Sequence, residues 1–338
     1  MQEQGWIGYA LRKLLVDGAR YFRETQFTPV QARTGMGPHG ATFGDLFFDQ
    51  ELPADQAMGE WFVRTVRARK GEMGQIRRIV IEGRREPVTV SPDGVATLYV
   101  DPLDNSQGYH AYMGMDPHER PLSPHVFAAA ITLVQEWSES GESIAPRFRD
   151  IVAAGMISLS PTVKDPQPLL PLPQEQPLCA TSAWSRPSPF TSKSKSDGAV
   201  GLNATVIFEG YYPETRAVVE AGFRDVSGAL RSMGCAALEM VYPAIGSAAG
   251  YVCTSQKLHE LGAAWQVALS RGAVVFTWSV EEGLAVKRRP LDDEPYIFNS
   301  KMPVCIARDM PTADALWKRI QRGYRLIHQR SMNEEGVE

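Results

Sequence analysis

A proline-rich segment in the middle of the chain limits most strongly how this sequence can fold. Eight prolines fall between Pro161 and Pro189, and the polar run TSKSKSDG follows at residues 191–198. Because proline fixes φ and lacks a backbone donor, such a segment does not continue a helix or a central strand. We therefore predict a long loop or domain junction here, which divides the chain near residue 200.

Helical and strand patterns occur together before this junction. Residues 5–25 carry apolar groups at helical spacing, and a second helix is predicted over residues 54–69. Residues 76–81 and 95–100 are typical of strands, whereas the apolar segment 123–137 fits either a helix or a buried strand. The first half of the chain is therefore predicted to be an α+β domain, residues 1–200.

The same mixture continues after the junction. A final helix is predicted from Thr312, whose hydroxyl suits an N-cap. The other predicted elements are strands over residues 203–211, 272–278 and 302–308 and a helix over residues 215–232. We therefore predict a C-terminal α/β domain, residues 201–338, and a layered α/β protein as a whole.

The composition places the chain among globular proteins and excludes several classes of function. Hydrophobic residues make up 43% and charged residues 22% of the 338 residues, enough for one large or two medium cores. A formal net charge of −4 gives no basic surface for a nucleic-acid backbone. No apolar run approaches the roughly 18 to 20 residues that span a bilayer, and the N-terminal sequence lacks the basic start of a signal peptide. We expect a cytoplasmic protein with a small-molecule partner, and neither a nucleic-acid polymer nor a membrane as partner.

The cysteines agree with a reducing compartment. They are widely separated and form no CxxC pair: Cys179, Cys235, Cys253 and Cys305. Free cysteine is among the most buried residue types, so we predict packed thiols and neither a disulfide framework nor a zinc site.

The stretch DPLDNSQGY, residues 101–109, follows the apolar run VATLYV and sets two carboxylates three positions apart. Asp101 and Asp104 repel each other unless both are exposed or a cation neutralises them. If Pro102 keeps the turn stiff, both carboxylates and the Leu103 carbonyl point at one spot. Such a set of hard oxygen ligands suits Mg²⁺.

The residues that follow suit an anion. Asn105 and Ser106 are placed to start a helix, where free backbone N–H groups and the positive end of the dipole favour a phosphate. The alternative is an ordinary surface turn with an Asx cap. A calcium loop does not fit, because Leu103 stands at its third position and Tyr112 at its twelfth. The G-x-G-x-x-G match at residues 35–40 contains a proline and follows no predicted strand, so we interpret it as a loop.

Three segments carry a resemblance to one superfamily. The first is DPLDNS, which is similar to the signature DP[IL]DG[ST]; the second is PADQAMGE, residues 53–60, which resembles the helix start TATDQxVE. The third, residues 231–264, resembles without a gap the block RSxGxAALxLCxVAxGxxDAYxExxxxxWDxAA. With these motifs in order, the chain resembles the Mg²⁺-dependent, lithium-sensitive phosphatases over about two thirds of its length: inositol monophosphatase, fructose-1,6-bisphosphatase and the bisphosphate nucleotidases. The resemblance implies their layered αβαβα sandwich.

The resemblance also implies a metal site. Its ligands would be Glu82, Asp101, Leu103 through its carbonyl, Asp104 and Glu260. Glu82 is chosen because it ends an apolar strand, and Glu86 is the second choice; a structural salt bridge is the alternative for either. Glu260 stands where the family has aspartate, next to His259 in place of tryptophan, and the alternative is that it stabilises the start of a helix.

The catalytic and phosphate-binding roles are implied in the same way. Asp55 and Ser106 would orient a water activated with the help of Glu82, and the N–H groups of Asn105 and Ser106 would bind the phosphate. A helix N-cap is the alternative for Asp55. Asn105 replaces the motif's glycine and is the side chain that best tolerates a left-handed backbone there.

Together these features predict a Mg²⁺-dependent phosphomonoesterase acting on an inositol phosphate, fructose-1,6-bisphosphate or a similar sugar phosphate. The resemblance implies two or three Mg²⁺ ions, inhibition by Li⁺ and a homodimer. Cys253 and Ala249 stand where the family has inositol-contacting acids, which argues against inositol monophosphate as the preferred substrate. The alternatives are a 3'(2'),5'-bisphosphate nucleotidase and a non-catalytic homologue that acts as a binding or assembly module.

Overall fold

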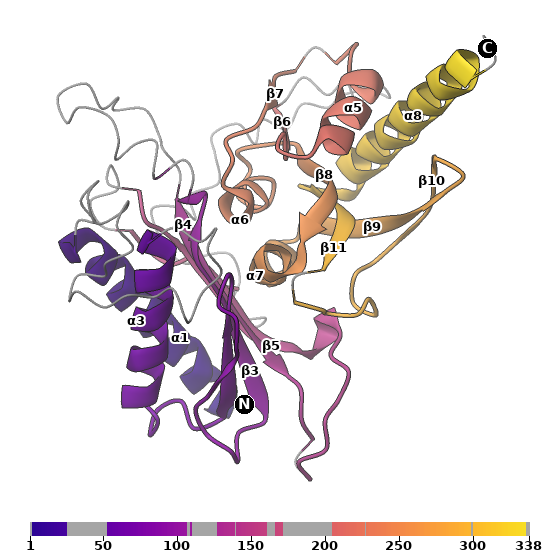
Figure 1. Ribbon diagram of the computed structural model, residues 1–338. Helices are drawn as coiled ribbons and strands as arrows, with labels where there is room; N and C mark the ends of the chain where they lie inside the picture. The colour runs from indigo at the N-terminus through magenta and orange to yellow at the C-terminus, as the bar shows by residue number, and fades with distance from the viewer. Residues whose placement is uncertain are drawn as a thin grey trace, which may run out of the picture.

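The computed structural model describes residues 2–25, 53–106, 109, 127–138, 140–160, 166–171, 205–226, 228–298 and 300–335. These residues form two mixed sheets and helices in five layers (Figure 1). Helices α1 (Gln2–Thr25) and α3 (Pro53–Ala68) cover the outer face of the first sheet. Helices α6 (Ala236–Glu239) and α7 (Leu258–Ser270) lie between the sheets. Helices α5 (Pro213–Gly222) and α8 (Met310–Glu335) cover the second sheet, which confirms the predicted αβαβα sandwich.

The first sheet has the strand order β2-β1-β3-β4-β5. Its strands are β1 (Ile76–Ile81), β2 (Val88–Thr89), β3 (Ala96–Asp104), β4 (Ala128–Gln135) and β5 (Ile151–Ser158), preceded by a short 3₁₀ helix, η1 (Phe148–Asp150). Strand β1 runs parallel to β3, and the other neighbours are antiparallel. The ambiguous segment 123–137 therefore contributes a strand, β4, because both its edges pair within a sheet covered on both faces.

Strand β3 is longer than predicted and includes the acidic motif. The apolar run was expected to end the strand at Val100, but β3 continues to Asp104 and all its residues are buried. Asp101 pairs with Ala130 and Asp104 with Ala128 of β4, with a shift of register between them. Pro102 has no N–H to give to the ladder, so a bulge at this point lets pairing resume beyond it.

The second sheet has the order β10-β9-β11-β8-β6-β7. Its strands are β6 (Val206–Phe208), β7 (Leu230–Arg231), β8 (Gly250–Lys257), β9 (Val274–Glu281), β10 (Leu284–Arg289) and β11 (Lys301–Ala307). The predicted helix over residues 215–232 is wrong in its second half, since α5 ends at Gly222, where a Cβ would collide with the Arg319 carbonyl of α8. Thr312 is not the cap of α8; it donates its N–H to Asp309 Oδ1 over 2.9 Å.

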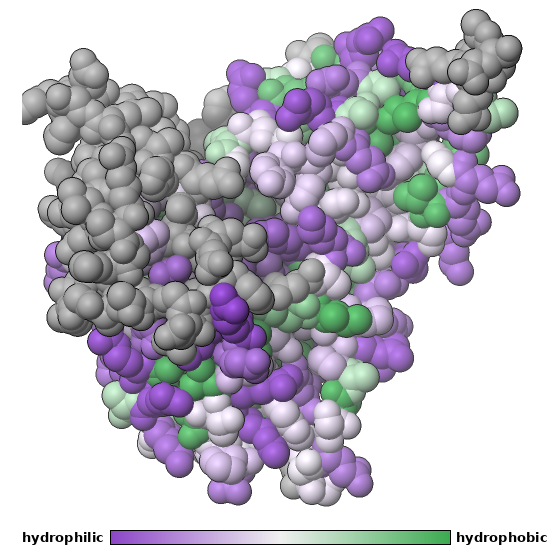
Figure 2. All heavy atoms as spheres, in the orientation of Figure 1, coloured by the Kyte–Doolittle hydropathy of each residue, from purple (hydrophilic) through white to green (hydrophobic). Residues whose placement is uncertain are grey.

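The strands of the first sheet come from residues 76–158 and those of the second from residues 206–307. The domain boundary near residue 200 stays a prediction, because residues 172–204 lie outside the described residues, as does Cys179. The other three cysteines are buried free thiols. On the face shown in Figure 2, the described surface is largely hydrophilic and its hydrophobic residues form small separate groups. Within the described ranges, no helix has the length and apolar character needed to cross a membrane.

Candidate functional site

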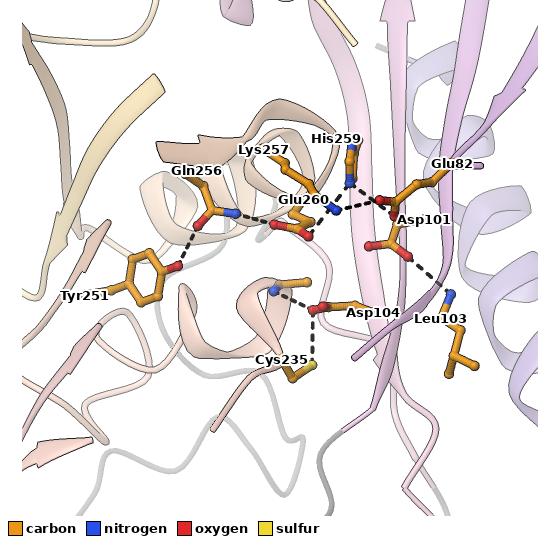
Figure 3. A network of polar contacts seen from close by, with 11 residues as sticks. Glu82, Asp101, Leu103, Asp104, Cys235, Tyr251, Gln256, Lys257, His259 and Glu260 are labelled. Carbon is orange, nitrogen blue, oxygen red and sulfur yellow. Dashed lines mark hydrogen bonds and ion pairs between the residues drawn. The ribbon is translucent and has the colours of Figure 1, made fainter. Parts of the chain in front are cut away.

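Four acidic side chains converge between the two sheets (Figure 3). Glu82 follows β1 directly, Asp101 and Asp104 lie in β3, and Glu260 lies in the first turn of α7. The parallel pairing of β1 with β3 sets Ile81 opposite Val100, and the Glu82 N–H donates to the Val100 carbonyl over 2.9 Å. The side chains of Glu82, just after β1, and Asp101, within β3, therefore lie at the same level of the sheet.

The acidic groups form two overlapping sets that share Asp101. Ligand atoms of Asp101, Asp104 and Glu260 lie within 4.8 Å of one another, and the same holds for Glu82, Asp101 and His259. Asp101, Asp104 and Glu260 are 2%, 6% and 7% exposed. Three carboxylates so close and so buried repel one another strongly unless protons or a cation neutralise them.

Hydrogen bonds orient the two aspartates. Asp104 Oδ2 accepts from the Ala237 N–H over 2.7 Å and from the Cys235 thiol over 3.1 Å, so the start of α6 fixes this carboxylate. Asp101 Oδ1 accepts from the Leu103 N–H over 3.2 Å. Asp101 Oδ2 is buried and has no hydrogen-bond partner among the residues that the structure describes. This oxygen belongs to the acidic cluster and is available to bind a cation.

Glu260 is held from the opposite side. Its Oε2 accepts from the Gln256 amide, whose own oxygen accepts from the Tyr251 hydroxyl over 2.5 Å. Glu260 also lies at the N-terminal end of α7, where a negative charge is favourable. Glu260 can therefore both stabilise the start of α7 and belong to the acidic cluster.

Two further side chains complete the cluster: Lys257, which the sequence motifs did not indicate, and His259, which they indicated only as a replacement for tryptophan. The Lys257 ammonium lies 2.7 Å from Glu82 Oε1. His259 Nε2 lies 3.1 Å from Glu82 Oε2 and 3.7 Å from Glu260 Oε1. The sequence KLHE, which places both residues just before Glu260, was the available signal. It could not be interpreted without knowing that the end of β8 meets the end of β1.

The pKa values follow from burial and from neighbouring charges. Burial, together with repulsion from the other carboxylates, raises the pKa of Asp101 and of Glu260 well above the usual range. Burial also raises the pKa of Asp104, although its bonds from Ala237 and Cys235 oppose the shift. Burial opposes ionisation of Glu82 too, but His259 and Lys257 outweigh it and lower its pKa. Within the acidic cluster, Glu82 is therefore the ionised carboxylate whose negative charge is balanced by side chains of the protein.

Two of the remaining predicted residues, Asn105 and Ser106, directly follow Asp104 in the chain. Asn105 has φ of +67°, so the asparagine does adopt the left-handed backbone expected in place of glycine. The Tyr109 N–H donates to the Asn105 carbonyl over 3.0 Å, as in a first helical turn that includes Ser106. Asp55 is buried in the first turn of α3, and Glu86 is exposed away from both acidic sets. The roles of Asp55, Ser106 and the Leu103 carbonyl stay predictions.

A further buried acid, Glu239, accepts hydrogen bonds from the backbone of residues 233–234, which precede α6. Glu239 is fully buried, and its Oε1 accepts from the N–H groups of Met233 and Gly234, the latter over 3.0 Å. Its Oε2 has no hydrogen-bond partner within the described part of the chain. Burial, followed by the charge of Glu209, raises the pKa of Glu239 to about 9. The folded protein therefore holds this side chain protonated at neutral pH.

The raised pKa of Glu239 predicts a pH-dependent stability. Its contribution is complete below the unfolded pKa of 4.5 and is lost as pH rises toward about 9, because only the unfolded chain ionises freely there. Glu239→Gln mimics the protonated acid, so in metal-free protein we expect it to raise the free energy of unfolding at pH 9 by at least about 1 kcal/mol and to have less effect at pH 5. Urea unfolding at both pH values measures this. The exposed Glu220→Gln is the control, and an equal effect of the two substitutions at pH 9 would be evidence against a protonated Glu239.

Comparisons with known proteins identify the fold. No protein-family model matches the sequence, and no curated protein matches it. Among solved structures, a Toxoplasma gondii protein assigned as a sedoheptulose-1,7-bisphosphatase has a TM-score of 0.58 at 12% identity, covering 94% of both chains. An inositol monophosphatase-fructose 1,6-bisphosphatase has a TM-score of 0.54 at 12% identity, covering 91% of this chain and 98% of the other. The extragenic suppressor protein suhB of Bartonella henselae has a TM-score of 0.52 at 13% identity, covering 94% and 98%. This chain therefore has the fold of the inositol monophosphatase and fructose-1,6-bisphosphatase-like phosphatases.

Proposed function

We propose that this protein is a Mg²⁺-dependent phosphomonoesterase that acts on a small phosphorylated metabolite. The observation that carries the proposal is the set Asp101, Asp104 and Glu260, whose buried carboxylate oxygens lie within 4.8 Å of one another. No other described residue forms a hydrogen bond with Asp101 Oδ2. A hard divalent cation fits this set of oxygens and removes the repulsion between them. The fold of the phosphatase neighbours supports the same activity.

Each residue of the site then has a task. Asp101, Asp104 and Glu260, together with the Leu103 carbonyl, hold the cation, which when bound supplies positive charge that acidifies water and neutralises the leaving oxygen. The contacts from Cys235 and Ala237 keep Asp104 turned into the cluster.

The substrate side of the site is formed by the turn after β3. Ser106 and Asp55 orient the attacking water, and the N–H groups of Asn105 and Ser106 bind the phosphate. The left-handed backbone at Asn105 and the hydrogen bond from the Tyr109 N–H to the Asn105 carbonyl support this assignment, because they show a tight turn directly after Asp104.

A sugar phosphate, including a bisphosphate, is the substrate class that we favour over inositol monophosphate. Cys253 and Ala249, which replace the family's inositol-contacting acids, are 0% and 1% exposed, and the Cys253 sulfur accepts from the Ser255 N–H over 3.4 Å. Neither side chain offers an oxygen to a substrate hydroxyl. We further propose a cytoplasmic homodimer that is inhibited by Li⁺.

Phosphate release from a panel of esters tests the function. The panel contains fructose-1,6-bisphosphate, sedoheptulose and inositol phosphates and a 3',5'-bisphosphonucleoside, each with Mg²⁺, with EDTA, and with Mg²⁺ plus Li⁺. We expect release from at least one sugar phosphate that requires Mg²⁺ and is reduced by Li⁺. Release only from the nucleotide would assign a bisphosphate nucleotidase. Inactivity toward every ester, together with no Mg²⁺ binding, would favour a non-catalytic binding module and contradict the proposal.

A further inference from the structure

A lysine is already hydrogen-bonded to one carboxylate oxygen of Glu82, and a histidine ring lies against the other. Oε1 lies 2.7 Å from the Lys257 ammonium, and Oε2 lies 3.1 Å from His259 Nε2. Among the described residues, Asp101 and Asp104 form no such ion pair; they accept hydrogen bonds from the Leu103 and Ala237 N–H groups and the Cys235 thiol. Of the carboxylates in the two sets, Glu82 is therefore paired with a cationic side chain of the protein, whereas Asp101 and Asp104 have no such partner in the described part of the chain.

The position of Lys257 is set by the backbone. It is the last residue of β8 and the N-cap of α7, with φ −68° and ψ 137°, and its partner in the ladder is Lys301 of β11. The side chain is 35% exposed, and it extends from the strand end to Glu82, 175 positions earlier in the chain. Figure 3 shows its ammonium group between the carboxylates of Glu82 and Glu260. The backbone of Lys257 is therefore held by β8 and its ammonium group by Glu82, which fixes a positive charge inside the cluster.

This charge occupies the Glu82 side of the acidic cluster. The ammonium lies 2.7 Å from Glu82 Oε1, and a carboxylate at this distance favours the charged form of a lysine. A divalent ion bound to Glu82 would meet this ammonium at close range and would have to displace it.

We propose that Lys257 takes the place of one divalent ion, so that the centre binds a single exchangeable ion, at Asp101, Asp104 and Glu260. Glu82 then acts as a positioning residue that holds Lys257 beside the ion. The inference rests on the proposed function and narrows it: the two or three ions implied by the resemblance become one ion and one ammonium group. An ammonium also remains in the site when the divalent ion leaves.

Counting bound Mn²⁺ tests this inference. The full chain is stripped with EDTA and titrated with Mn²⁺ by calorimetry, and bound Mn²⁺ is counted independently by electron paramagnetic resonance. We expect one ion in the wild type, one in Lys257→Arg and two in Lys257→Met, since only the last removes the positive charge that is paired with Glu82. Lys318→Met, an exposed position on α8, is the matched control and should bind one ion.

The number of bound Mn²⁺ ions supports or overturns the single-ion proposal. Two ions in the wild type would overturn it, even if Lys257→Met does not fold, and so would a single ion in a folded Lys257→Met variant. Two ions in the wild type with Mg²⁺-dependent phosphate release would leave the proposed function standing. No Mn²⁺ in the wild type or in any variant would overturn both.

Discussion

Asp104→Asn is expected to reduce phosphate release at least about 1,000-fold, because the substitution removes one of the charges that hold the cation. The shape of the side chain is kept. An amide oxygen can still accept the Ala237 N–H that Asp104 Oδ2 accepts over 2.7 Å, so α6 keeps its place against β3. The loss should therefore appear in turnover and in Mg²⁺ affinity, without loss of the folded state. Phosphate release on the best ester of the panel, together with circular dichroism, measures both.

The control for this substitution is Asp93→Asn, which makes the same chemical change in an exposed turn before β3. It should retain the activity of the wild type. Asp104→Asn should also be at least as stable as the wild type in EDTA, since it removes a buried carboxylate from a cluster in which burial and Glu82 raise its pKa. Unchanged turnover in a folded Asp104→Asn variant would exclude Asp104 from the catalytic centre.

Mg²⁺ is expected to raise the thermal unfolding midpoint of the protein by roughly 5 °C at 100 times its dissociation constant. An ion that binds only the folded state adds about 2.7 kcal/mol at that concentration, and each kcal/mol shifts the midpoint of a chain of this size by about 2 °C. The physical source is the relief of repulsion between Asp101, Asp104 and Glu260. Thermal unfolding with Mg²⁺ and with EDTA, at constant ionic strength, measures the shift.

The specificity of this stabilisation has its own control. The shift should be much smaller in Asp104→Asn and should remain in Asp93→Asn, since only the first lies in the acidic cluster. A shift of the same size with KCl at matched ionic strength would point to general screening of surface charge, and would weaken the case for a divalent site.

Much of the site was predictable because it follows from local rules. Glu82 could be preferred over Glu86 because it ends an apolar strand, and the parallel pairing of β1 with β3 places it beside Asp101. Asn105 could be expected to take a left-handed backbone, and its φ is +67°. The layered fold followed from mixed helical and strand patterns together with motifs whose order resembles one superfamily.

The rest depended on contacts that no local pattern contains. Strand β3 runs on to Asp104 because β4 pairs with it beyond the bulge, and pairing between distant segments is not visible in the apolar run itself. Lys257 and Glu82 are 175 positions apart, and their contact requires the two sheets to meet. The thiol of Cys235 was expected to pack in a core, and it does so against Asp104.

The most direct test of the central claim is a crystal structure of the protein soaked in Mn²⁺, with anomalous scattering recorded to locate the ion. We expect an anomalous peak within coordination distance of oxygens of Asp101, Asp104 and Glu260, with Lys257 still paired to Glu82. A fully occupied Mn²⁺ site elsewhere in the molecule, with these three carboxylates bound to no ion, would contradict it.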